Sequence, residues 1–127
     1  NDIKRVYIEN GKLKIDQTLK DYLDDVEKLS IGEIYLNSIQ KDGTGQGYDI
    51  TQLIDILDNI KTPIILAGGA GNHLHLIEGL KISSVDAVAT ANLFNFLGDS
   101  LPKARTKILE EGLPLANFES VNAALIR

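Results

Sequence analysis

Two segments of this chain carry groups suited to holding a phosphate. Residues 64–67, Ile-Ile-Leu-Ala, lead directly into the glycine-rich segment 68–71, Gly-Gly-Ala-Gly. Glycines let backbone N–H groups approach an anion without a Cβ in the way, and the N-terminal end of a following helix favours negative charge. A second apolar run, residues 85–91, ends at Asn92, which is a helix-capping residue type. The two strand ends together predict a phosphate site, although the glycines alone would also fit a tight turn.

Charge and composition narrow the classes of partner. The 127 residues include 13 Lys and Arg against 18 Asp and Glu, a net charge of -5 that opposes binding to nucleic acid or to an anionic membrane. The chain has no cysteine, which excludes disulfides and thiolate metal sites and fits a reducing compartment. No apolar run approaches the roughly 20 residues that span a bilayer, and the first residues do not resemble a signal peptide. We therefore expect a cytoplasmic protein that binds neither nucleic acid nor membranes.

The first third of the chain predicts a small hairpin followed by a helix. Residues 6–8 and 13–15 are short β-type runs, and the Asn-Gly pair at 10–11 predicts a two-residue hairpin turn between them. Asp16 is expected to cap an amphipathic helix. The apolar face of that helix is formed by Leu19, Tyr22, Leu23, Val26 and Leu29.

The rest of the chain predicts an α/β fold. Strands are expected at residues 34–36, 64–66 and 85–91, and helices at 53–60, 74–80 and 102–111. Parallel strands need crossovers that cover the sheet, so this alternation indicates βαβ units on a parallel sheet. Three strands are too few to close a barrel, and Asn1-Asp2 resembles the end of a strand. We expect residues 1–127 to form one half-barrel domain with one phosphate-binding site.

Several motifs in a fixed order resemble the cyclase subunit of imidazole glycerol phosphate synthase. They are Gly-Glu-Ile-Tyr-Leu-Asn-Ser-Ile-Gln-Lys-Asp-Gly-Thr at 32–44, Gly-Tyr-Asp at 47–49, the glycines of 68–71 and Ala-Asn-Leu-Phe-Asn-Phe at 91–96. The resemblance covers nearly all of this chain and implies the C-terminal half of a (β/α)8 barrel. It implies an enzyme that takes ammonia from a glutaminase partner and a ribulosyl-aminoimidazole nucleotide. The products would be imidazole glycerol phosphate and aminoimidazole carboxamide ribotide, with no metal or organic cofactor.

The resemblance assigns one phosphate of this substrate to five residues. These are Gly43, Gly68, Gly69, Ala91 and Asn92, and most of them would act through backbone N–H groups. The family usually has serine at the position of Asn92. Asparagine still caps a helix, but its larger side chain changes the geometry around the phosphate.

The resemblance also implies roles for four polar residues. Asp2 matches the family's general acid or base, a role that suits ring closure with ammonia, and its alternative is a charge at a frayed terminus. Asn37 and Asp42 would line the substrate site, although Asp42 equally fits an Asp-Gly turn. Glu33, at the opposite end of the barrel, would belong to the charged ring through which ammonia enters. The alternative for Glu33 is a solvated edge residue.

Two alternative functions also fit the sequence. Gln40 stands where the family usually has an aspartate. This departure fits a paralogue that works beside an amidotransferase on a sugar-derived substrate in bacterial surface-polysaccharide biosynthesis. A further reading is a non-catalytic half-barrel that binds a phosphorylated metabolite. If the chain is part of a cyclase, we expect it to be inactive alone, because the aspartate on the first barrel strand is missing.

Two more expectations concern metals and self-association. His73 and His75, at i and i+2 of a helix, do not share a face, so we expect solvated residues and no metal site. The isolated half-barrel is expected to form a homodimer, because unpaired sheet edges and uncovered inward faces favour association. The strands concerned carry Ile34, Leu36, Ile65 and Val88.

Overall fold

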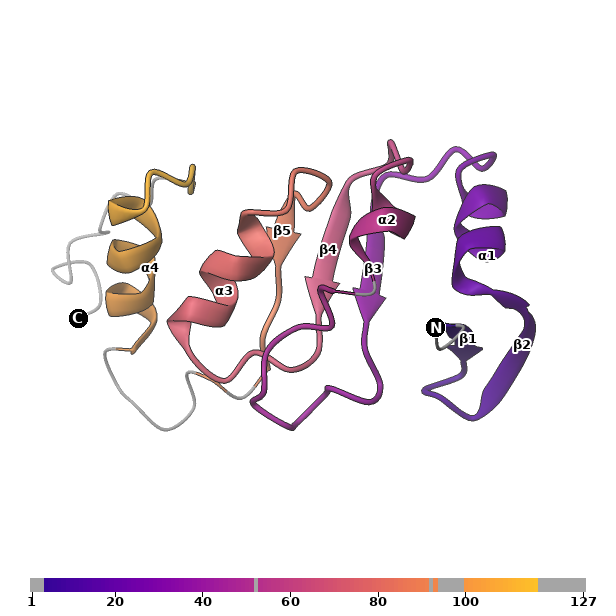
Figure 1. Cartoon of the computed structure of the whole chain (residues 1–127), viewed down its shortest axis with the longest axis horizontal. Coiled ribbons are helices and arrows are strands. Elements are labelled where there is room, and N and C mark those ends of the chain that lie inside the picture. Colours follow the sequence, from indigo (N-terminus) through magenta and orange to yellow (C-terminus); the bar gives the residue numbers. More distant parts are fainter. Residues whose placement is uncertain (1–3, 52, 92, 94–99, 117–127) are drawn as a thin grey trace, which may run out of the picture.

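The computed structural model describes residues 4–51, 53–91, 93 and 100–116. A hairpin of β1 (Arg5–Ile8) and β2 (Leu13–Thr18) leads into helix α1 (Leu19–Val26). The elements that follow are β3 (Ile34–Asn37), α2 (Ile54–Leu57), β4 (Ile64–Ala67), α3 (His73–Leu80), β5 (Ala87–Val88) and α4 (Ser100–Glu110), as Figure 1 shows. This order confirms an α/β chain in which strands alternate with helices.

The central sheet is parallel, with strand order β3-β4-β5. Strand β5 is shorter than the predicted run 85–91. Hydrogen bonds to β4 nevertheless continue on both sides of it, from the N–H of Asp86 to Ile64 O (2.9 Å) and from the N–H of Ala89 to Leu66 O (2.8 Å). The sheet therefore brings the carboxyl ends of β3, β4 and β5 to one edge.

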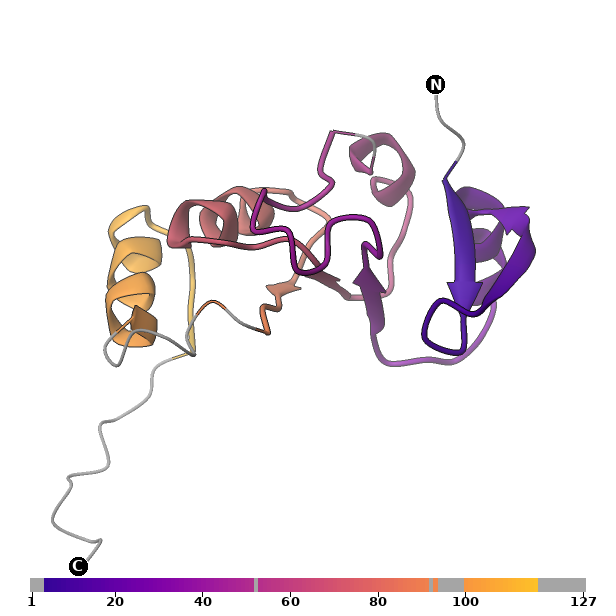
Figure 2. The ribbon, with the colours of Figure 1, turned by 90° about the horizontal axis from the view of Figure 1, so that it is seen from below.

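Helices cover only one face of this sheet. Figure 2 shows α2 and α3 on the same side of the strands. The core lies beneath them and includes Leu23, Leu57, Ile64, Leu66, Leu76 and Ile77, with Leu19, Tyr48, Leu53, Val85, Ala104 and Ile108. No helix of the described residues covers the other face, which we call the bare face. It carries Tyr35, Asn37, Ile65 and Ala87, because paired residues of neighbouring strands point to the same side.

Three of the four apolar residues expected on the uncovered face of the sheet lie on the other face. Ile34, Leu36 and Val88 pack against the core beneath the helices. Among the four residues named for the missing half-barrel, only Ile65 lies on the bare face. The physical reason is the strand period of two, which sends neighbouring residues of a buried run to opposite faces.

Two local predictions for the hairpin region are wrong. Asp16 lies within β2, and the side chain of Thr18 caps α1 in its place. The strand runs on to Thr18 because it pairs with β1 near both ends, with Arg5 opposite Thr18 and a register shift between Arg5 and Tyr7. The connection has four residues, not two, and the backbone takes positive φ at Glu9, Asn10 and Gly11.

Two helices are shorter than expected. Helix α1 ends at Val26, and α2 covers only four residues of the predicted range 53–60. After α1 the carboxylate of Glu27 accepts hydrogen bonds from the N–H groups of Lys61 (3.1 Å) and Thr62 (2.9 Å), which ties this turn to the start of β4. Within the described ranges, no helix has the length and apolar character needed to cross a membrane.

Candidate functional site

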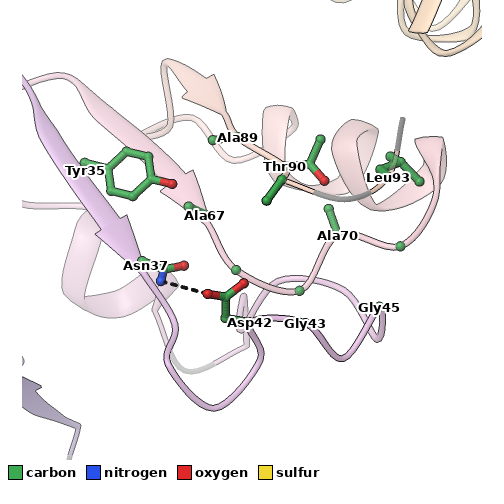
Figure 3. A pocket seen from close by; sticks show the side chains of 14 residues that line it. Tyr35, Asn37, Asp42, Gly43, Gly45, Ala67, Ala70, Ala89, Thr90 and Leu93 are labelled. Carbon is green, nitrogen blue, oxygen red and sulfur yellow. Dashed lines mark hydrogen bonds between the residues drawn. The ribbon is translucent and has the colours of Figure 1, made fainter. Parts of the chain in front are cut away.

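A pocket of about 410 Å³ lies at the carboxyl ends of the three parallel strands, as Figure 3 shows. It is lined by residues of the β3–α2 loop, the glycine-rich segment and the end of β5. The lining residues are Tyr35, Asn37, Asp42, Gly43, Gly45, Ala67, Gly68, Gly69, Ala70, Gly71, Ala89, Thr90, Ala91 and Leu93. Six predicted site residues therefore meet in one place: Asn37, Asp42, Gly43, Gly68, Gly69 and Ala91.

The glycine-rich segment allows two loops to touch backbone to backbone. The N–H of Gly47 donates to Gly69 O at 2.8 Å. A Cβ on Gly69 would lie 2.2 Å from Gly47 O, and its φ of +110° also favours glycine. A Cβ on Gly71 would lie 2.3 Å from Gly45 O. The glycines thus have a packing role of their own, as the tight-turn reading required, and they form one wall of the pocket.

The first turn of α3 uses several of its donors internally. The side chain of Asn72 accepts from the N–H groups of Leu74 (2.8 Å) and His75 (3.1 Å). The N–H of Gly71 donates to His75 Nδ1 at 3.0 Å. Within the described part of the chain, the N–H groups of Gly69 and Ala70 have no acceptor. Gly69 and Ala70 also line the pocket, so their amides are available to a ligand there.

The two histidines are not simply solvated. His75 is half-buried, accepts the hydrogen bond from Gly71 and packs against Gly47. Accepting at Nδ1 requires the proton of the neutral ring to be on Nε2. His75 therefore closes the first turn of α3 against the loops. Among the residues that the structure describes, no group of His, Cys, Asp and Glu is arranged to hold a metal ion.

The polar side of the pocket comes from the β3–α2 loop. The Asn37 amide donates to the Asp42 carboxylate at 3.5 Å, and both side chains are exposed at the pocket. The N–H of Asp42 donates to Ser38 O at 2.8 Å, and Gly43 has a φ of +75°. Asp42 and Gly43 therefore form a turn and line the pocket at the same time, which agrees with both readings made from the sequence.

Tyr48 holds the segment after β5 that lines the pocket. It belongs to the motif at 47–49 but was assigned no role from the sequence. Its hydroxyl donates to Ala89 O at 3.0 Å, and only 6% of the residue is exposed. Burial raises the pKa of the Tyr48 phenol, so the hydroxyl stays protonated as a donor. Its ring packs against Gly79, where a Cβ would come within 3.0 Å of it. The available signal was an aromatic residue inside an otherwise polar loop.

One predicted site residue lies away from this pocket, and two others lie outside the residues that the structure describes. Glu33 is exposed and precedes β3, at the end of the sheet opposite the pocket. Asp2 and Asn92 lie outside the described residues. Gln40 is exposed in the turn after β3, outside the pocket lining.

The family model and the curated relatives that match this chain point to the same protein family. The family model described as "Histidine biosynthesis protein" matches residues 1–98, which include the glycine-rich segment and the β3–α2 loop. A protein of Parasynechococcus marenigrum with the provisional name imidazole glycerol phosphate synthase subunit hisF2 is 43% identical over 80% of this chain and 38% of its own length.

Two relatives named imidazole glycerol phosphate synthase subunit HisF extend the match. The Hydrogenobaculum protein is 36% identical over 89% of this chain and 45% of its own length. The Chloroherpeton thalassium protein is 36% identical over 87% of this chain and 44% of its own length. The chain thus spans less than half the length of these relatives. Because the family model covers more than half of the chain, the chain belongs to the histidine biosynthesis protein family.

Proposed function

We propose that this chain is the C-terminal half of a (β/α)8 cyclase of the imidazole glycerol phosphate synthase type and holds one phosphate of its substrate. The observation that supports this most is the pocket at the carboxyl ends of β3, β4 and β5. Enzymes with (β/α)8 barrels bind substrates at this end, often with a phosphate between the loops after the last two strands. Residues 68–71 and 89–91 are such loops if β4 and β5 are the last two strands of the barrel.

Backbone amides would provide most of the phosphate contacts. The N–H groups of Gly69 and Ala70 are available at the start of α3, and Ala91 lines the same pocket. Gly43 lines the same pocket from the β3–α2 loop. A net charge of -5 makes the rest of the molecule unfavourable for anions, so a local site of this kind is needed.

The complete enzyme would need groups beyond this pocket. Asp2 would transfer protons during ring closure, together with an aspartate from the other half-barrel. Glu33, on the opposite end of the sheet, would face the glutaminase partner and the incoming ammonia. No metal or cofactor enters the proposal. A cytoplasmic location fits it, because a phosphorylated substrate does not cross the apolar core of a membrane.

A paralogous cyclase-like subunit of polysaccharide biosynthesis is the second candidate. Gln40 favours it, because the family usually has an aspartate there. Both candidates work beside an amidotransferase, and the substrate of the second is derived from a sugar. They therefore differ in the ligand.

A charge change at Ala91 tests the phosphate site. Ala91 is exposed and lines the pocket, so replacing it leaves the core intact. Ala91→Asp places a carboxylate beside the anion, whereas Ala91→Asn adds a side chain of nearly the same size without charge. We expect Ala91→Asp to weaken binding of ribose 5-phosphate about tenfold or more, as one close like-charge pair near a protein surface does. Equal affinities of the two variants in a calorimetric titration would contradict the proposal.

A further inference from the structure

An aromatic ring, an amide and a carboxylate follow one another along the bare face of β3 and the loop after it. Tyr35 comes first, Asn37 follows two residues later on the same face, and Asp42 lies in the loop beyond. All three line the pocket, and the available amides of Gly69 and Ala70 lie at its far end. A ligand that extends from these amides along β3 meets first a carboxylate, then an amide and finally an aromatic ring.

The side chain of Tyr35 contributes little to the stability of the fold. Its side chain is 63% exposed, and within the described residues its hydroxyl has no hydrogen-bond partner. Figure 3 shows the ring extending over the sheet toward Ala67. The contrast with Tyr48 is clear, because that ring is buried and its hydroxyl donates to Ala89 O. An exposed aromatic ring that lines a pocket is a contact surface for a ligand.

The space beside this ring is left open by small side chains. Ala67 lines the pocket next to Tyr35, and Ala89 lines it from β5. On the bare face Ala87 pairs with Ile65, which in turn pairs with Tyr35. The methyl groups of Ala67 and Ala89 leave room for a flat group on the pocket side of the phenol ring, whereas Ile65 borders the ring within the sheet.

We propose that Tyr35 is a specificity-determining residue that contacts the planar heteroaromatic ring of the phosphorylated ligand. This inference rests on the proposed function, because it takes the ligand's phosphate to be held at Gly69, Ala70 and Ala91. Aromatic side chains stack on the faces of such rings, and each stacked base contributes appreciably to affinity. The Asn37 amide lies between the two subsites and suits the polar atoms that join ring and phosphate.

Two ligands that share a phosphate distinguish binding of the ring at Tyr35 from binding of the phosphate at Gly69, Ala70 and Ala91. The full chain is titrated with aminoimidazole carboxamide ribotide, which has a heteroaromatic ring, and with ribose 5-phosphate, which has none. We expect the ribotide to bind more tightly. Tyr35→Ala should lower the ribotide affinity about tenfold and change the ribose 5-phosphate affinity less than twofold. Tyr35→Phe, which keeps the ring, should retain the ribotide affinity.

Tyr7→Ala is the matched control, because Tyr7 is also an exposed tyrosine on a strand but lies outside the pocket. It should leave both affinities unchanged. A Tyr35→Ala protein that binds both ligands like the parent, or loses both equally, overturns the role of Tyr35. So does a parent chain that binds the two ligands equally. If ribose 5-phosphate binding is absent, or insensitive to Ala91→Asp, the proposed phosphate site fails instead.

Discussion

The two faces of the β3-β4-β5 sheet have different tasks. On the helix-covered face, Ile64 and Leu66 are 0% and 1% exposed and form the centre of the core. On the bare face, Tyr35 is 63% exposed, and Ile65 is only half-buried. One face therefore provides free energy of folding through burial, and the other leaves side chains exposed, where we propose that a ligand binds.

The difference in burial between the two faces explains why neighbouring residues of β3 differ in polarity. Parallel sheets are normally covered on both faces, and their strands are apolar on both. Strand β4 follows this rule with Ile-Ile-Leu-Ala, whereas β3 alternates as Ile-Tyr-Leu-Asn. The alternation in β3 assigns polar and aromatic groups to the bare face. The strand is thus built for packing on one side and for contacts on the other.

The largest effect is expected from shortening a side chain of the covered face. Leu66→Ala should lower the free energy of unfolding by about 2–5 kcal/mol, because it leaves a cavity in the core. Ile65→Ala is the matched control, since Ile65 is the adjacent residue and faces the bare side. Ile65→Ala should lower the free energy of unfolding by well under half of the loss caused by Leu66→Ala. Urea unfolding of both variants measures this, and equal losses would show that the bare face is packed like the core.

The next effect concerns association of the isolated chain through the bare face. Uncovered apolar surface favours a dimer, as do the outer edges of β3 and β5, which pair with no other strand in the described ranges. We expect light scattering to give about twice the monomer mass at micromolar concentration, and Ile65→Glu to shift the chain to monomers. Lys12→Glu, a change of larger charge in the exposed hairpin loop, is the control. A monomeric parent chain would mean that the bare face needs no partner.

A smaller effect is expected at Tyr48, which links the covered face to the pocket. Tyr48→Phe removes the hydrogen bond to Ala89 O while keeping the ring against Gly79. The loss should be about 1 kcal/mol in the free energy of unfolding. Tyr7→Phe, at an exposed position, should cause no measurable loss. If the two variants unfold alike, the hydroxyl of Tyr48 does not hold the end of β5.

The smallest effect is a pH dependence away from both faces. Hydrogen bonds from Thr62 and then Lys61 hold the pKa of the Glu27 carboxyl below its ordinary value of 4.5. A lowered folded-state pKa stabilises the fold above about pH 4.5, and this contribution is lost as the pH falls through the folded-state value. The stability of the parent should therefore approach that of Glu27→Gln in acid. A difference that stays constant with pH would contradict this.

Local patterns allowed two strands and the glycine-rich loop to be predicted, whereas Asn37, Asp42 and Gly43 were assigned through the resemblance to the cyclase family. Apolar runs marked β3 and β4, and the glycines marked the loop where backbones come close. Contacts between distant segments were not predictable in the same way. Tyr48 reaches Ala89, 41 residues away, and His75 closes a turn that also touches Gly47. The start of α1 was misplaced because pairing of β2 with β1 outweighed the capping preference of Asp16.

The central claim is that a phosphate binds at the carboxyl ends of the strands through backbone amides. Amide chemical shifts of the ¹⁵N-labelled chain, followed during titration with ribose 5-phosphate, test it most directly. We predict saturable shifts that are largest for Gly69, Ala70 and Ala91, which line the pocket. Saturable shifts confined to other parts of the chain, or no shifts at these three amides, would contradict the account.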